Sequence, residues 1–147
     1  MPDKIKTRSA RLPGHLIRRL HQQSTKVFTD RVKDAGFDLT PIQFVALDAL
    51  SENEGIDQAG LAEAIAKDRA TTGAVADRLE QKGLMSRNVS PRDRRARTLT
   101  LTPQGRHILA AMTPVVSALQ ADILPGLTDE EYRQFVTLAE KATRAQQ

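Results

Sequence analysis

Helix start signals occur at short intervals along this chain and restrict it to helices joined by tight turns. A residue whose side chain can cap a helix recurs at Thr40, Asp57, Asp68, Thr102 and Thr128. Proline follows two of these caps at the first helical position, where its missing N–H is not needed. Thr128 also has the spacing of a capping box with Glu131. Together with an apolar helical repeat that begins after Pro13, these signals predict six helices.

The predicted helices leave one segment with a different pattern, between the fourth helix and the fifth. There Leu84–Val89 and Thr98–Leu101 are strand-like, and Ser90-Pro91-Arg92-Asp93 between them is typical of a turn. The predicted fold is therefore mainly α with a small β-hairpin wing, in which a winged helix-turn-helix lies between N- and C-terminal helices. The expected helices lie between Pro13 and Gly36, Thr40 and Gly55, Asp57 and Ala66, Asp68 and Gly83, Thr102 and Ile123, and Thr128 and Ala142.

The excess positive charge is concentrated in the predicted hairpin. Between Arg87 and Arg97 five arginines face a single acid, Asp93, while the rest of the chain holds 17 basic and 17 acidic residues. This segment therefore accounts for the whole formal charge of +4. A cluster of this kind suits the phosphates of a nucleic acid, and the alternative is a solvated surface without a partner.

A helix-turn-helix followed by an arginine-rich hairpin is a winged helix, whose parts can contact different grooves of DNA. The fourth helix fits the major groove, and the hairpin can place an arginine in the minor groove. One side of this helix is expected to face the core, with Thr72, Val75, Ala76 and Leu79. The candidate DNA-binding residues are Arg69, Thr71, Thr72, Gly73, Ala74, Asp77 and Arg78 on the helix and Arg92, Asp93, Arg94, Arg95 and Arg97 on the hairpin.

Four short motifs in order resemble the signature of MarR-family transcriptional regulators. They are Leu39–Phe44, Asp77–Leu84, Asp93–Arg95 and Leu101–Gly105, within a resemblance that covers Leu12–Ala142. The resemblance implies a homodimeric winged-helix repressor that binds a pseudo-palindromic operator on double-stranded DNA and leaves it on binding a small effector. It also implies that Asp93 helps to hold the wing, that Arg95 reaches the minor groove, and that Arg78 contacts the DNA backbone or supports the recognition helix.

The sequence departs from the family where many relatives have longer polar side chains on the recognition helix. Here Gly73 and Ala74 occupy those positions, so base readout is expected to rely more on Arg69, Thr71 and the wing. Small residues allow close approach to DNA, but they can also merely fill space between helices. Specificity is then expected to depend partly on groove shape, because a narrow minor groove attracts arginine.

The effector site is expected where the family commonly places it, between the dimer scaffold and the winged helix. The candidate ligand-binding residues are His15, Arg19, Gln22 and Phe44. The first three share a helix face and could meet an anionic ligand, although they suit an ordinary surface equally well. The run Asp68–Thr72 resembles the branch of the family that controls aromatic-acid degradation. A phenolic acid or its coenzyme A thioester is therefore the expected effector.

The expected organisation is a basic tail at residues 1–11, a winged helix-turn-helix at 37–102, and a helical dimerisation region at 12–36 and 103–147. Cysteine is absent and there are three histidines, so neither a metal site, a cofactor nor a thiol sensor is expected. No catalytic motif indicates an enzyme. No apolar run suits a membrane, and the protein is expected to be cytoplasmic. The alternative function is architectural DNA binding without an effector.

Overall fold

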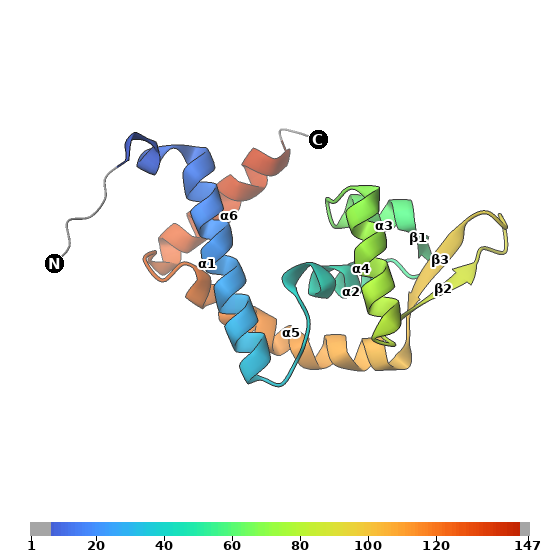
Figure 1. Ribbon diagram of the computed structural model, residues 1–147. Coiled ribbons are helices and arrows are strands. Elements are labelled where there is room, and N and C mark those ends of the chain that lie inside the picture. The colour runs from blue at the N-terminus through green and yellow to red at the C-terminus, as the bar shows by residue number, and fades with distance from the viewer. Residues whose placement is uncertain (1–6, 145–147) are drawn as a thin grey trace. The chain divides into compact units, whose positions relative to one another are not determined.

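The computed structural model describes residues 7–144, which form helices and one small antiparallel sheet (Figure 1). The fold class expected from the sequence is confirmed. None of the helices in this part of the chain is long and apolar enough to cross a membrane. In order, the elements are the 3-10 helix η1 (Arg8–Arg11), α1 (Pro13–Asp34), α2 (Pro41–Glu52), β1 (Ile56–Asp57), α3 (Gln58–Ala64), α4 (Arg69–Gln81), β2 (Met85–Val89), β3 (Arg97–Leu101), α5 (Pro103–Ile123) and α6 (Asp129–Arg144).

The chain forms two compact units. Phe28–Ser117 is one unit and contains the winged helix. The described residues up to Val27 and from Ala118 onward make up the other, which contains α6 and one end each of α1 and α5. Both unit boundaries fall inside continuous helices. The end of α1 contributes Phe28 and Val32 to the buried side chains of the winged-helix unit, beyond the boundary drawn from the sequence.

The expected capping residues begin their helices in the structure. The Thr40 hydroxyl accepts a hydrogen bond from the Gln43 N–H, and the Gln43 side chain accepts one from the Thr40 N–H, so this cap is a complete capping box. Thr128 and Glu131 form a second box. The side chains of Asp57, Asp68 and Thr102 accept from the backbone N–H three residues later. Local sequence signals therefore place the helix starts correctly.

The wing is the outer part of a three-stranded antiparallel sheet in the order β1-β3-β2. Strands β2 and β3 form the predicted hairpin, with Arg87 opposite Leu99. Strand β1 pairs Ile56 with Leu99 and was not predicted, because two residues are too few to show a strand pattern. Arg97 begins β3, so it lies in the strand and not in the loop at the tip.

The recognition helix α4 packs against the core through the side expected from its sequence. Thr72, Val75, Ala76 and Leu79 are buried, while the neighbouring positions on the other side are exposed. The core around them comes from α2, α3, the sheet and α5 of the same unit. Its most deeply buried large side chains include Leu47, Leu50, Leu61, Leu99 and Met112.

Gly105 lies in the first turn of α5 and packs directly against the backbone of Leu84, the residue before strand β2. An added Cβ at this position would lie 2.0 Å from the Leu84 carbonyl oxygen. The contact is fixed by Thr102, whose hydroxyl donates to the Gly83 carbonyl at 2.6 Å and whose N–H donates to the Leu84 carbonyl at 3.1 Å. The clash would be with backbone, which cannot rotate away as a side chain can.

Gly105→Ala is therefore expected to lower the free energy of unfolding by about 2 kcal/mol or more, the range of an overpacked core position. Urea unfolding followed by circular dichroism measures the change. Gly126→Ala is the matched control, because an added Cβ there meets nothing within 4 Å. Equal unfolding midpoints for the two variants would contradict the close-packing interpretation.

Candidate nucleic-acid interface

The exposed side of α4 carries most of the residues expected to contact DNA. Arg69, Thr71, Ala74 and Arg78 are exposed, as is Ala70 between the first two. Thr72 is different and corrects the prediction: it is fully buried, and its hydroxyl donates to the Asp68 carbonyl at 2.8 Å. The Thr72 side chain therefore belongs to the core and cannot reach a base.

Gly73 is half-buried beneath α3 and does not form an open surface. An added Cβ would lie 3.1 Å from the Gln58 side-chain nitrogen. A glycine at this position lets the first turn of α3 approach the middle of α4. The small residue thus serves packing inside the helix-turn-helix, which was the alternative interpretation of this position.

Thr71 is held by the residue that caps its helix. The Asp68 carboxylate accepts a hydrogen bond from the Thr71 N–H at 2.8 Å and another from the Thr71 hydroxyl at 2.9 Å. Both bonds favour the charged carboxylate and so hold the pKa of Asp68 below its ordinary value. The bond from the backbone N–H has the larger effect. Since the hydroxyl proton is used within the protein, the Thr71 oxygen is left to accept hydrogen bonds from outside.

A lowered pKa has a testable effect on stability. The stabilisation that Asp68 provides is complete above the ordinary pKa of 3.8 and is lost as the pH falls through the lower folded-state value. Asp68→Asn cannot lose a charge in this range. The variant is expected to lose less of its stability than the wild type between about pH 5 and pH 3, as measured by urea unfolding. Equal losses would show that the carboxylate is not stabilised by its bonds to Thr71.

The turn at the tip of the wing is ordered by its own side chains. The Asp93 carboxylate accepts from the Arg95 N–H at 2.9 Å, and the Ser90 hydroxyl accepts from the Arg92 N–H at 3.3 Å. Backbone hydrogen bonds from Ala96 to Asp93 and from Ser90 to Ala96 close the loop. Asp93 therefore organises the turn that presents the arginines on either side of it.

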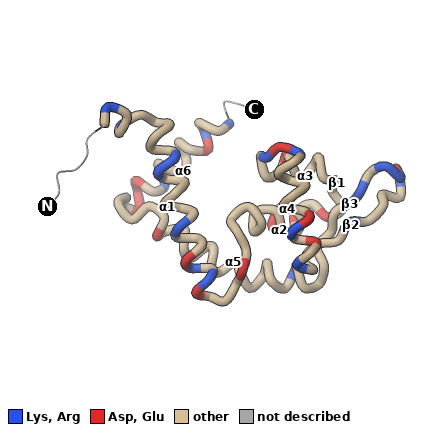
Figure 2. The backbone as a smooth tube through the Cα atoms, in the orientation of Figure 1, with Lys and Arg blue, Asp and Glu red and all other residues tan. Residues whose placement is uncertain are grey.

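Four wing arginines remain exposed around this turn, and the charge gathers visibly at the end of the hairpin (Figure 2). Within residues 7–144, none of the four forms an ion pair with an acid. A dense, unneutralised set of guanidinium groups on a narrow ribbon suits the phosphates and the minor groove of DNA. These residues are Arg92, Arg94, Arg95 and Arg97.

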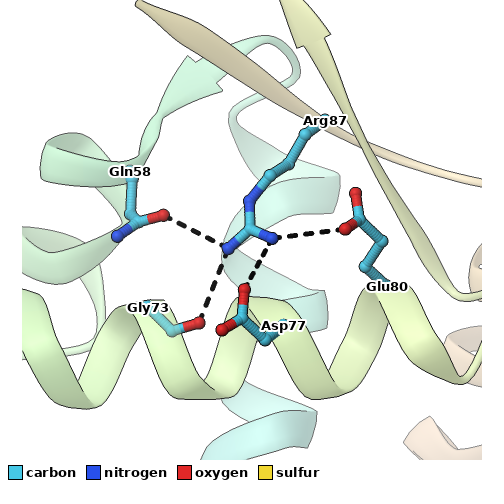
Figure 3. Close-up of polar contacts among 5 residues, drawn as sticks. All are labelled: Gln58, Gly73, Asp77, Glu80 and Arg87. Carbon is cyan, nitrogen blue, oxygen red and sulfur yellow. Dashed lines mark hydrogen bonds and ion pairs between the residues drawn. The ribbon is translucent and has the colours of Figure 1, made fainter.

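Arg87, the fifth arginine of the sequence cluster, points inward instead (Figure 3). Its side chain is only 20% exposed, and its Nη1 lies 2.7 Å from Asp77 Oδ1 and 3.3 Å from Glu80 Oε1. Asp77, which was expected to face DNA, is thus engaged with the wing strand. Two acids three residues apart on one side of α4, Asp77 and Glu80, are the sequence signal from which the pairing with Arg87 could have been predicted.

The expected effector residues do not all lie in one unit. His15, Arg19 and Gln22 are on α1 in the unit that contains α6, with Arg19 and Gln22 exposed. Phe44 is in the winged-helix unit, where its ring packs against Phe28 with centroids 6.3 Å apart. A shared effector site for these four residues stays a prediction.

The unit that contains α6 has a hollow of about 330 Å³ between its three helix segments. Residues of α1 other than the expected ones line it, namely Leu20, His21 and Ser24. Gln120 and Tyr132 add polar groups from α5 and α6. In the described part of the chain, His, Asp and Glu side chains do not gather in a set of three that could hold a metal ion.

Comparison with known proteins identifies the family. The model of the MarR family matches residues 39–96. The transcriptional regulator HosA from Escherichia coli O111:H- is 34% identical over 131 residues, which are 89% of this chain and 94% of HosA. The chain belongs to the MarR family. It is a transcriptional regulator, as HosA is, and the sequence-based resemblance is confirmed.

Solved MarR-type structures match the whole fold. BpsR of Bordetella bronchiseptica, whose DNA binding is regulated by 6-hydroxynicotinic acid, has a TM-score of 0.85 and 31% identity, covering 95% of this chain and 98% of BpsR. The transcriptional repressor CouR bound to a 23-mer DNA duplex has a TM-score of 0.81 and 32% identity, covering 97% of this chain and 99% of CouR. Both relatives support DNA as the partner of this MarR-family chain.

Proposed function

We propose that this chain is a homodimeric, ligand-responsive repressor and not an enzyme or an architectural protein. Its target is a pseudo-palindromic operator, from which a small aromatic or anionic effector releases it. The observation that carries the proposal is the presence, in one compact unit, of an exposed helix-turn-helix face and four exposed wing arginines that form no ion pair with an acid of residues 7–144. CouR, a repressor solved on DNA, and BpsR, regulated by an aromatic acid, support it.

The two parts of the winged helix have separate tasks in this proposal. Helix α4 enters the major groove, where Arg69 and Arg78 contact the backbone or base edges and Ala74 can touch a thymine methyl. The wing follows the backbone, and Arg95 enters the minor groove while the Asp93 turn holds its direction. Asp77 acts from within the protein, through its contact with Arg87.

Arg95→Ala is expected to weaken operator binding by more than about 1 kcal/mol, because it removes a charged contact from the minor groove. Fluorescence anisotropy at fixed salt measures the dissociation constant. Arg133→Ala provides the control, since this arginine lies on α6 and pairs with Glu130. An unchanged dissociation constant for the Arg95 variant would contradict the role of the wing.

Thr71 gives a more specific expectation about the operator. Its hydroxyl donates to the Asp68 carboxylate, so toward DNA it can only accept a hydrogen bond. The major-groove donors are the N6 amino group of adenine and the N4 amino group of cytosine. We therefore expect Thr71 to favour adenine or cytosine at the position it contacts.

Thr71→Val tests this expectation, because valine keeps the shape of threonine and removes the oxygen. Wild-type protein should discriminate roughly tenfold in favour of the preferred base at this position, which is about what one good base contact contributes. The valine variant should lose this discrimination. Thr71→Ser keeps the acceptor and should keep the preference. Competition with single-base operator variants measures both, and an unchanged preference in the valine variant would refute the contact.

Dimerisation follows from the need for two recognition helices. Two half-sites one helical turn apart need α4 helices held roughly 34 Å apart by a two-fold axis. The terminal helices at residues 12–36 and 103–147 are the proposed scaffold, with 37–102 as the DNA-binding region. Their exposed apolar side chains include Leu12, Leu16, Ile17, Phe135, Val136 and Leu138. A second copy of this chain is the proposed cover for that apolar surface.

Effector release requires a ligand that binds one dimer geometry better than the other. Such a ligand can shift DNA binding only by the ratio of its affinities for the two geometries. We propose a phenolic acid or its coenzyme A thioester, bound near His15, Arg19, Gln22 and Phe44. The regulation of BpsR by 6-hydroxynicotinic acid supports an aromatic acid as the chemical class.

Selection of bound duplexes from a random pool at about 150 mM salt tests the proposed function. A regulator should recover one inverted repeat and prefer it by roughly 10³-fold or more over random duplex. The recovered duplex then serves as the probe for release by aromatic acids and their thioesters. Recovery of A·T-rich DNA without symmetry would instead support an architectural protein and overturn the proposal.

A further inference from the structure

Arg87 connects the wing to the recognition helix through acceptors on two helices (Figure 3). Its Nη1 contacts the carboxylates of Asp77 and Glu80 on α4, at 2.7 and 3.3 Å. Its Nη2 lies 3.4 Å from the Gln58 side-chain oxygen on α3 and 3.5 Å from the Gly73 carbonyl oxygen on α4. One side chain from strand β2 therefore contacts both helices of the helix-turn-helix.

We propose that Arg87 is a positioning residue that holds the wing in register with α4, so that both grooves of one half-site are read together. It does this without touching DNA. The proposal rests on the proposed function, since it concerns how the same winged helix reads its operator. It separates Arg87 from the other four arginines of the sequence cluster, which are free to meet phosphates.

Burial and hydrogen bonding both favour a role inside the protein. The Arg87 side chain is 20% exposed, whereas Asp77 and Glu80 are 62% and 45% exposed. The flat guanidinium group can hold several acceptors at fixed angles, which a lysine cannot do. A phosphate contact would require Arg87 to leave two carboxylates that would then repel each other and the DNA.

Arg87 joins the β2 side of the wing to α4, whereas strand β3 of the same hairpin contacts α2, β1 and α3. Beyond its pairing with β3, strand β2 packs against α4, and Arg87 is the charged group at that junction. The hairpin continues past Arg87 to the exposed tip that carries Arg92, Arg94 and Arg95. A small rotation at the base of the hairpin therefore produces a larger displacement of the arginines at its tip.

The double variant Arg87→Met/Asp77→Asn separates positioning from charge. It removes one positive and one negative group, so the net charge of the protein is unchanged. Methionine also keeps an unbranched apolar stem in the space of the arginine. The matched control is Arg133→Met/Glu130→Gln, which removes an exposed ion pair from α6 with the same balance of charge.

The first measurement is the distance between the wing and α4 in the protein without DNA. The sequence of 147 residues has no cysteine, so Pro91→Cys on the wing and Gln81→Cys on α4 can carry spin labels without background. Mixing the labelled protein with an excess of unlabelled protein restricts pulsed electron paramagnetic resonance to distances within one protomer. We expect the double variant to broaden or shift the distance distribution and the control to leave it unchanged. An unchanged distribution in the double variant would overturn the proposal.

The second measurement compares two duplexes. The double variant should keep its affinity and salt dependence on a random-sequence duplex, because the four exposed wing arginines remain. On the duplex selected by the wild type it should bind at least tenfold more weakly. A salt slope reduced by about 0.9 on the random duplex would mean that Arg87 contacts a phosphate, and would also overturn the proposal.

The two proposals fail in different ways. If the wild type selects no preferred duplex, the proposed function fails, while the distance measurement still decides the role of Arg87. If the double variant does not fold by circular dichroism, Arg87→Lys replaces it in both measurements. Lysine keeps the charge but lacks the rigid fork of donors, so the distance distribution and the affinity for the selected duplex then decide the proposal.

Discussion

The ion pair between Arg87 and Asp77 is the interaction on which the DNA-binding surface depends. A wing and a recognition helix come from different parts of the chain, and each alone offers DNA only a few contacts. Arg87 joins them at 2.7 Å, inside a set of acceptors that also includes Glu80, Gln58 and the Gly73 carbonyl. Gly73 leaves room for the Gln58 side chain, since an added Cβ would lie 3.1 Å from its amide nitrogen and the amide group would have to shift. The glycine that takes the place of a longer polar side chain thus serves packing inside the helix-turn-helix.

Much of the fold could be predicted from the sequence because its signals are local. A capping residue such as Asp68, a proline at the first helical position and a turn such as Ser90–Asp93 act within a few residues of themselves. Contacts between distant segments were not predictable in the same way. Strand β1 exists only because Ile56 meets Leu99, and Gly105 is required only because the backbone of Leu84 lies against it.

The candidate site shows the same division. The exposed wing arginines and the turn made by Asp93 could be predicted from composition and turn chemistry. Thr72 was assigned both to the core and to DNA, and its burial leaves only the first role. Asp77 was placed on the DNA surface from its side of the helix, and Arg87 was counted only in the basic cluster, because neither pattern reveals which charges neutralise each other. The expected effector residues depend on how distant helix segments come together, which local sequence patterns do not encode.

Methylation interference on the duplex selected by the wild-type protein tests the central claim most directly. Dimethyl sulfate marks guanine N7 in the major groove and adenine N3 in the minor groove, so one experiment reports on both. The account predicts major-groove interference inside each half-site, where α4 lies, and minor-groove interference beside it, where the wing lies. Interference confined to one groove, or absent from both, would contradict the claim that helix and wing read DNA as a single unit.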